Sequence, residues 1–522
     1  MNKVLVLYAL LPIILIFLLI VIMKWPASRA MPVAWLAAAI ISILVWAVPV
    51  AGIIASSFKG VLVAIDILFI VFGALLLLKI LQKGRAIEVI DYALAGLSQD
   101  RRVQAILVAW LFGSFVEGAA GFGTPAALAA PLLASIGFPA IAAVIVSLVA
   151  NSTAVSFGAA GTPLIMGIST ILPEQLKHLL PEISATSALL HAIIGTFVPL
   201  IMVCILTRFF GKNRSWKEGI AIAPYAIWAG LCFTIPYYLS ARLFGPEVPS
   251  IIGGIAGLAL LAITTRAGLF VPKTPWTFAG HKEKTLSFKT KLPVWKAFFP
   301  YILLGILLVI TRIRELGIGE ALKKVAISIP GAGYTFTPLY SPGFMFLIVC
   351  AVSWFLYGLS GKEAASSAAN AFVPLKNPAI SLVFAVAAVQ LIMNSGNNIS
   401  GLESMPAIIG SSLAVLGRLF VVLSPALGML GSFIVGSNTV SNLLFGAFQL
   451  ETALAVGLSP VLVLALQNVG GAVGNMISVH NIIAASATVG LHGEEGHIIR
   501  INLIPAISYA LLAGIIGALL LL

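Results

Sequence analysis

The chain has 522 residues, of which 60% are hydrophobic and only 9% are charged. About a quarter of the residues of a soluble domain are charged, so this composition excludes an ordinary water-facing surface, and lipid must be the solvent for most of the chain. The formal net charge of +13 would suggest nucleic acid binding in a soluble domain. Here the basic residues stand in short connectors between apolar runs, which is the positive-inside bias of membrane proteins. We therefore expect the lipid bilayer, and no nucleic acid, as a partner.

The apolar runs predict an all-α, polytopic membrane protein with about 12–14 transmembrane segments. Each clear candidate is close to the ~20 residues that a helix needs to cross ~30 Å of hydrocarbon. The first run is longer than the apolar part of a cleaved signal peptide, so we interpret it as a retained span. The clear candidates are 4–23, 32–50, 60–81, 187–207, 220–240, 249–265, 297–313, 342–358, 379–395 and 501–522.

The basic connectors predict the orientation of the chain. Connectors rich in Lys and Arg stay in the cytoplasm, and there are four of them: 24–29, 79–102, 208–219 and 266–296. We therefore expect a multi-pass protein of the cell inner membrane with its N-terminus outside. The cytoplasmic loop 266–296 would separate an N-terminal half, 1–265, from a C-terminal half, 297–522.

Two regions, 103–175 and 403–495, are apolar but dense in Gly, Ser, Thr, Asn and Pro. Broken backbone at membrane depth persists only where protein or a water-filled cavity satisfies its polar groups. The regions also match each other at a Gly-Ser-Phe triplet, at a Gly-rich segment and at an amide-containing break: 113–115, 118–125 and 151–153 against 431–433, 436–442 and 467–468. Paired interruptions in two halves indicate a transporter site. We predict two repeats, each with a re-entrant or broken-helix region; chance similarity is the alternative.

Helix N-termini in these regions suit a small carboxylate, because their unpaired N–H groups attract an anion without a fixed charge. Thr124 is expected to be an N-cap and Pro125 the first helical residue, while Gly121 and Gly123 allow close approach. The alternative is that Gly and Ser only let helices pack closely. The predicted substrate-binding residues are Gly121, Gly123, Thr124, Asn151, Ser152, Thr153, Ser437, Asn438, Thr439, Asn442, Asn468 and Arg418.

Ionisable residues inside apolar runs are rare and usually functional. Glu117 opens the first Gly-rich break and is the first candidate for proton coupling, with Asp66 second and His480 third. An ion pair or helix cap is the alternative for Asp66, and polar packing is the alternative for His480. Arg418 could bind a carboxylate bidentately or neutralise Glu403. We expect no metal and no cofactor apart from a coupling ion, H⁺ or, as the alternative, Na⁺ held by amides and carbonyls.

The sequence favours a transporter over an enzyme. It contains no His-Glu-x-x-His zinc motif and no Walker lysine. The Gly-rich run 118–123 lacks the spacing and the strand context of a dinucleotide-binding loop. A channel is a weaker alternative, because broken helices in two halves are typical of alternating access.

Residues 113–125, read as GSFVEGAAGFGTP, resemble the signature of bacterial L-lactate permeases. Residues 150–163, 436–442 and 470–478 resemble further segments of that family. The resemblance implies a secondary active transporter, a proton symporter for lactate, glycolate and related small 2-hydroxy monocarboxylates. In that family an acid commonly stands at the position of Asn438 and a lysine at that of Asn475. These departures leave open an ion-coupled carrier of another organic anion, a dicarboxylate or sulfonate, driven by sodium. The sequence also leaves open whether the protein is a homo-oligomer.

Overall fold

The computed structural model describes residues 3–121, 123–278, 292–329 and 333–521. Almost all of the described chain is helical, and twelve helical segments in it are long and apolar enough to cross a membrane. The prediction of an all-α polytopic membrane protein is therefore confirmed. Phe122 and parts of the connectors 266–296 and 314–341 lie outside the described residues.

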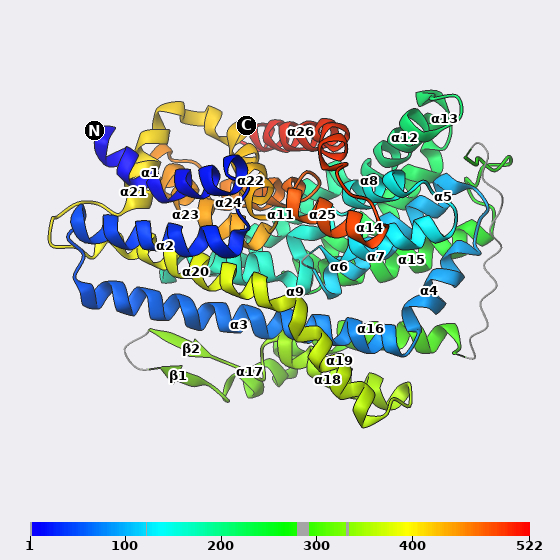
Figure 1. Ribbon diagram of the computed structural model, residues 1–522, viewed down its shortest axis with the longest axis horizontal. Coiled ribbons are helices and arrows are strands. Elements are labelled where there is room, and N and C mark those ends of the chain that lie inside the picture. Colours follow the sequence, from blue (N-terminus) through cyan, green and yellow to red (C-terminus); the bar gives the residue numbers. More distant parts are fainter. Residues whose placement is uncertain (1–2, 122, 279–291, 330–332, 522) are drawn as a thin grey trace.

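One group of helices forms a layer along the lower side of Figure 1, where α2, α3 and α20 lie side by side. The group comprises α2 (Ala27–Leu44), α3 (Val50–Lys83), α4 (Ala86–Ala95), α16 (Val294–Arg312), α17 (Ile318–Lys323), α18 (Pro342–Leu356), α19 (Gly361–Phe372) and α20 (Lys376–Met393). Helix α1 (Lys3–Phe17) lies above α2 in Figure 1 and packs against it. A small antiparallel hairpin, β1 (Ile327–Ile329) and β2 (Tyr334–Phe336), pairs Ser328 with Thr335 beside α3.

Small residues bring the helices of this layer into close contact. A Cβ atom added at Gly73 of α3 would lie 2.8 Å from the Cβ of Phe346 in α18. A Cβ added at Gly60 would overlap the backbone of Ala387 in α20. Close backbone approach at small residues is how helices pack in a bilayer, where lipid removes the hydrophobic drive for association.

The first broken region continues above this layer, followed by four further helices. It comprises α5 (Arg101–Ala105), the π-helical η2 (Ile106–Phe112), α6 (Gly113–Ala119), α7 (Thr124–Ser135), α8 (Ala140–Ala150), η3 (Ala154–Phe157), α9 (Gly158–Thr162), η4 (Pro163–Ile168) and α10 (Ser169–Ile171). The helices that follow are α11 (Leu180–Gly195), α12 (Val198–Phe210), α14 (Ala223–Phe244) and α15 (Pro249–Arg266), with the short α13 (Trp216–Ile220) after α12.

The second broken region packs against the first. It comprises α21 (Met405–Leu413), the turn η9 (Ala414–Leu419), α22 (Phe420–Val435), α23 (Asn438–Val456), α24 (Pro460–Gly474), α25 (Val479–Thr488) and α26 (Glu495–Leu519). Residues 102–119 and 461–478, one stretch from each region, are buried throughout, whereas the first span, 3–22, is mostly on the surface. The most interior parts of the fold are therefore the two stretches that contain helix breaks.

A buried ion pair joins three connectors at one end of the molecule. Arg102 forms a bidentate pair with Asp100, at 3.0 Å from Nε to Oδ1 and 2.6 Å from Nη2 to Oδ2. Its Nη1 donates to the carbonyl of Glu218 at 2.6 Å. The backbone N–H of Trp276 donates to Asp100 at 3.0 Å, and the indole donates to Glu218 at 2.7 Å. The connectors 79–102, 208–219 and 266–296 therefore meet at the same end of the helices.

Candidate functional site

Each broken region contains two interruptions. In the first, α6 ends at Ala119 and α7 begins at Thr124, after Gly121 and Gly123 in the left-handed conformation. A second interruption follows α8, where the segment Ala159–Gly161 has positive φ before helical structure resumes at Pro163. Two successive alanines with φ of 44° and 51° are strained, so the surrounding packing must impose this turn.

In the second region, α22 ends at Gly436, which has φ of +73°, and Ser437 caps α23 through the N–H of Val440 at 3.4 Å. The next interruption, 475–478, separates α24 from α25. Sequence reasoning expected this break at Gln467–Asn468, and that prediction is wrong, because α24 is continuous through both residues. The internal symmetry of the two halves stays a prediction.

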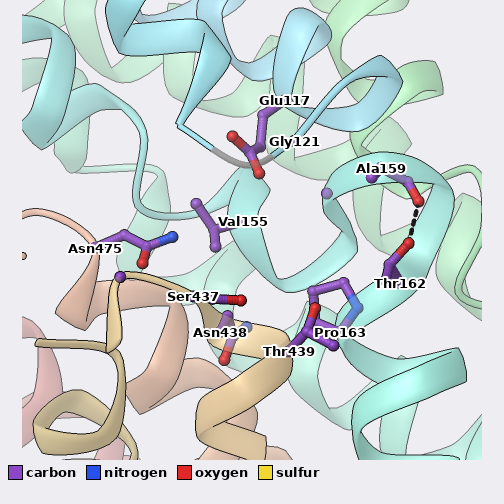
Figure 2. A pocket seen from close by; sticks show the side chains of 12 residues that line it. Glu117, Gly121, Val155, Ala159, Thr162, Pro163, Ser437, Asn438, Thr439 and Asn475 are labelled. Carbon is purple, nitrogen blue, oxygen red and sulfur yellow. Dashed lines mark hydrogen bonds between the residues drawn. The ribbon is translucent and has the colours of Figure 1, made fainter. Parts of the chain in front are cut away.

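The interruptions of the two regions line one cavity with an internal volume of about 20 Å³. That volume holds about one water molecule, so the cavity must widen before it can hold an organic solute. Figure 2 shows the lining residues from both regions: Glu117, Gly121, Val155, Gly158, Ala159, Thr162, Pro163, Gly436, Ser437, Asn438, Thr439 and Asn475. Glu117 is the one ionisable side chain among them.

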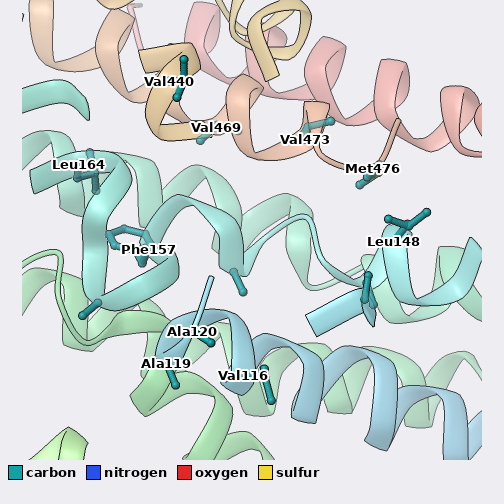
Figure 3. Close-up of a cluster of buried hydrophobic side chains, with 14 of the residues drawn as sticks. Val116, Ala119, Ala120, Leu148, Phe157, Leu164, Val440, Val469, Val473 and Met476 are labelled. Atoms are coloured by element: carbon teal, nitrogen blue, oxygen red, sulfur yellow. The ribbon is translucent and has the colours of Figure 1, made fainter. Parts of the chain in front are cut away.

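Buried apolar side chains lie near the helix breaks of both regions. Figure 3 shows buried residues of both regions packed around the breaks, among them Phe157 and Leu164 from the first and Val440 and Val473 from the second. A dry, low-dielectric environment strengthens every electrostatic interaction inside it. The few polar groups of the lining therefore decide what the cavity can bind.

The cavity has two electrostatically different sides. On one side, α23 begins at Asn438 and helical structure begins at Pro163, so the positive dipole ends of two helix N-termini border the cavity. On the other side, the last turn of α6 carries Glu117, and α24 ends with Asn475 as its C-cap. In Figure 2 the Glu117 carboxyl and the Asn475 amide extend toward Ser437 from above and from the left.

A buried amide network fixes the N-terminus of α23. The Oδ1 atom of Asn468 accepts hydrogen bonds from the amides of Asn438 and Asn442, both at 3.0 Å. The Asn442 amide also donates to the carbonyl of Pro163 at 2.9 Å, and the Asn468 amide donates to Ser187 at 3.2 Å. The network thus ties the second region to the helix start of the first, and it positions the cavity residue Asn438.

The predicted residues of the first region are only partly brought to the cavity. Gly121 and Glu117 line it, whereas Gly123 contacts Asn481 and lies outside the lining. The predicted N-cap at Thr124 is wrong, because Gly123 is the N-cap and the Thr124 hydroxyl donates back to the carbonyl of Gly121.

Asn151, Ser152 and Thr153 are buried behind the lining. The Ser152 hydroxyl donates to the carbonyl of Val149 at 3.0 Å, and the Thr153 hydroxyl is 3.3 Å from that of Tyr509. These residues can support the cavity, but they do not line it.

In the second region Ser437, Asn438 and Thr439 line the cavity as predicted. Asn442 and Asn468 support them through the amide network. Arg418 is exposed in η9, at the opposite end of α22 from Gly436. Sixteen helical residues span about 24 Å, so the structure does not bring Arg418 to the cavity.

Two predicted proton-coupling residues also lie elsewhere. Asp66, in α3, accepts a hydrogen bond from the hydroxyl of Tyr334 at 2.9 Å, beside the β-hairpin. His480 lies next to the cavity lining, where it borders one groove together with Ser437 and a second groove together with Lys24. Neither residue lines the cavity.

Sequence reasoning did not include Val155, Gly158, Thr162, Pro163 and Asn475 among the binding residues, although all of them line the cavity. The Gly-Thr-Pro triplet at 161–163 repeats the triplet at 123–125, and this repetition was a usable signal for Thr162 and Pro163. Asn475 was identified only as a departure from the family pattern.

Fold and site together define a class of protein: a polytopic membrane protein built around a small, buried, polar cavity between broken helices. The chain belongs to the L-lactate permease family, whose model matches residues 5–324 and 320–522. The L-lactate permease of Bacillus subtilis strain 168 is 31% identical, covering 97% of this chain and 94% of the relative. The relatives are named permeases, so the class is that of transporters rather than enzymes.

Two further relatives from Escherichia coli strain K12 are similar over nearly the whole chain. Its L-lactate permease is 28% identical, covering 98% of this chain and 95% of the relative. Its glycolate permease GlcA is 26% identical, covering 98% of this chain and 94% of the relative. Among solved structures, the YdaH transporter of Alcanivorax borkumensis aligns with a TM-score of 0.40 at 14% identity, covering 85% of this chain and 84% of that chain. The family assignment rests on the sequence relatives and takes nothing from this weak structural match.

Proposed function

We propose that the protein is a secondary active transporter that carries L-lactate and related small 2-hydroxy monocarboxylates together with a proton. The observation that carries this proposal is the composition of the cavity wall, in which one buried carboxyl, Glu117, faces two helix N-termini. Family membership supports lactate or glycolate as the substrate.

The substrate carboxylate binds at the helix N-termini in this proposal. The starts of α23 and of the segment at Pro163 offer N–H groups and positive dipole ends, and the hydroxyls of Ser437 and Thr439 add donors without net charge. The hydroxyl at carbon 2 of the substrate is then left to pair with the Asn475 amide or the Glu117 carboxyl across the cavity.

Proton coupling follows from having two carboxyl groups in one cavity. At about 5 Å and an effective dielectric constant of about 20, two negative charges repel each other by roughly 3 kcal/mol. That repulsion is worth roughly two orders of magnitude in Kd. The substrate anion therefore binds well only when Glu117 carries a proton, and the two must be released together.

Sodium is the second candidate for the coupling ion, because several buried oxygens of the described wall lack a hydrogen-bond donor. They are Glu117 Oε2, Asn438 Oδ1 and Asn475 Oδ1. Sodium is bound by carboxylate, amide and carbonyl oxygens at broken helices, so such atoms suit it.

We further propose that the protein lies in the cell inner membrane with its N-terminus outside. The basic connectors 79–102, 208–219 and 266–296 meet through Arg102, Glu218 and Trp276, which supports a common cytoplasmic side for them.

The experiment is uptake of labelled L-lactate by proteoliposomes under imposed proton or sodium gradients. Symport of one proton per lactate predicts about tenfold accumulation for a pH difference of one unit, because one unit corresponds to about 1.4 kcal/mol. A sodium gradient at equal pH should drive none. Accumulation that follows sodium alone would replace the proton in this proposal, and the absence of lactate uptake under either gradient would refute it.

A further inference from the structure

A buried chain of hydrogen bonds lies behind the cavity wall, and none of the roles described above uses it. The Nε2 atom of His191, in α11, is 2.7 Å from the hydroxyl of Ser156. Its Nδ1 atom is 2.6 Å from the hydroxyl of Tyr509, in α26. Tyr509 is in turn 3.3 Å from the hydroxyl of Thr153, and Ser156 donates to the carbonyl of Asn468 at 3.3 Å. Every one of these side chains is buried.

The hydrogen bonds select one tautomer of a neutral His191. Ser156 has one hydroxyl proton, which it donates to the carbonyl of Asn468, so it accepts from the Nε2–H of the imidazole. Nδ1 then accepts from the hydroxyl of Tyr509, and each ring nitrogen has a partner. The imidazole is thus held from both sides, and it fixes the positions of Ser156 and Tyr509.

The two ends of the chain reach the cavity wall. Ser156 stands next to Val155 and two residues before Gly158, and both of these residues line the cavity. The Asn468 carbonyl that accepts from Ser156 also accepts from the amide of the lining residue Asn438, at 3.2 Å. His191 therefore touches no lining atom itself, but it acts on both regions of the wall through Ser156.

We propose that His191 is a positioning residue, which holds the 153–158 segment in its cavity-forming geometry through the hydrogen bond from Nε2 to Ser156. Tyr509 orients the ring from the other side. The proposal rests on the proposed function for the identity of the ligand, but the geometry that it assigns to the wall does not depend on the substrate.

Two substitutions separate the two hydrogen bonds of His191. A glutamine places its terminal amide near the position of Nε2, so His191→Gln retains the contact with Ser156 and loses that with Tyr509. An asparagine places its amide at the level of Nδ1, so His191→Asn retains Tyr509 and loses Ser156. Both variants replace the ring by a primary amide, and they differ in side-chain length by one methylene, which decides the contact that is kept.

The first measurement is the Kd for L-lactate of the purified full-length protein. His191→Asn should raise Kd by about 3–10-fold, the change expected from losing one hydrogen bond, while His191→Gln should stay within about twofold of the wild type. Ser156→Ala should match His191→Asn, and the double variant should be no worse than either single variant. Equal effects of Asn and Gln, or additive effects in the double variant, would overturn the proposal.

The second measurement is hydrogen–deuterium exchange of residues 153–162 without ligand. His191→Asn should speed exchange in this segment, and His191→Gln should leave it as in the wild type. If the wild type binds no L-lactate, the proposed function fails, while the exchange rates still decide the role of His191. Unchanged exchange in both variants would refute that role. If His191→Asn does not fold, Ser156→Ala decides by the same two measurements.

Discussion

Replacing Gly158 by alanine tests whether the Glu117 carboxyl forms the cavity wall. Gly158 has φ of −64° and ψ of 153°, which any residue adopts, so alanine adds no backbone strain. Its Cβ atom would lie 3.2 Å from Cδ of Glu117 and would overlap Oε1. The carboxyl group must then move. Overpacking of this kind costs about 1–3 kcal/mol, which is roughly 5–150-fold in Kd if the cost falls on the substrate-bound state.

The assay compares Gly158→Ala with the wild type in L-lactate affinity and in proton-driven accumulation, after a melting curve has shown that the variant folds. Gly305→Ala is the matched control. Gly305 lies within α16, and a Cβ atom there would be 3.5 Å from Ile251, an ordinary van der Waals distance. That control should be neutral or slightly stabilising. Wild-type affinity and wild-type accumulation in Gly158→Ala would refute the assignment of the Glu117 carboxyl to the substrate cavity.

Four further outcomes follow from the same geometry. Glu117→Gln should abolish proton-driven accumulation of L-lactate while exchange across the membrane continues; gradient-driven uptake at the wild-type level would remove Glu117 from the mechanism. Asn438→Asp should weaken binding about tenfold or more, since the new oxygen would face two acceptor oxygens, and adding Asn475→Lys should recover affinity; a double variant no better than the single one would argue against a shared cavity. Arg102→Met should lower the unfolding free energy by about 3–5 kcal/mol, because Asp100 loses its bidentate partner, and an unchanged melting temperature would contradict this. Symport of one proton with one lactate moves no net charge, so a membrane potential without a pH gradient should drive no accumulation in liposomes; accumulation driven by the potential would require a second cation.

The helices that face lipid could be predicted from the sequence, because lipid selects long apolar runs whatever their neighbours are. Nine of the ten clear spans each coincide with one continuous helical segment, whereas 187–207 covers the end of α11 and the start of α12. The structure of the interior stretches was harder to predict. The glycines at 470, 471 and 474 were interpreted as a sign of broken backbone after Gln467–Asn468, yet α24 is continuous there.

The reason is packing against the neighbouring helix. A Cβ at Gly470 would overlap the carbonyl of Pro425 in α22, and a Cβ at Gly474 would overlap that of Met429. These glycines allow close helix contact, and they do not mark a break. A glycine that allows close helix contact and a glycine that marks a break look the same in the sequence, so only the position of the neighbouring helix distinguishes them.

The candidate site was predictable where a polar residue starts a helix, as at Ser437 and Asn438. It was not predictable where function depends on which end or which face of a helix meets the cavity. Arg418 has suitable chemistry but lies at the far end of α22. His191 looks from the sequence like an isolated histidine in an apolar run, because its partners Ser156 and Tyr509 are 35 and 318 residues away.

Under the proposed proton symport, the charge of the cavity accounts for neutral amides at positions 438 and 475. With Asn438 and Asn475 neutral, Glu117 is the one lining group that can carry charge. An empty cavity with ionised Glu117 has a charge of −1, and so has a cavity that holds a lactate anion beside protonated Glu117. The two forms that must cross the membrane barrier therefore have the same charge, and the difference in desolvation between them is small. An acid and a lysine at positions 438 and 475 would add −1 and +1 and leave that balance unchanged. The pair can thus be lost together without altering the coupling, whereas either charge alone would have to be buried without a partner.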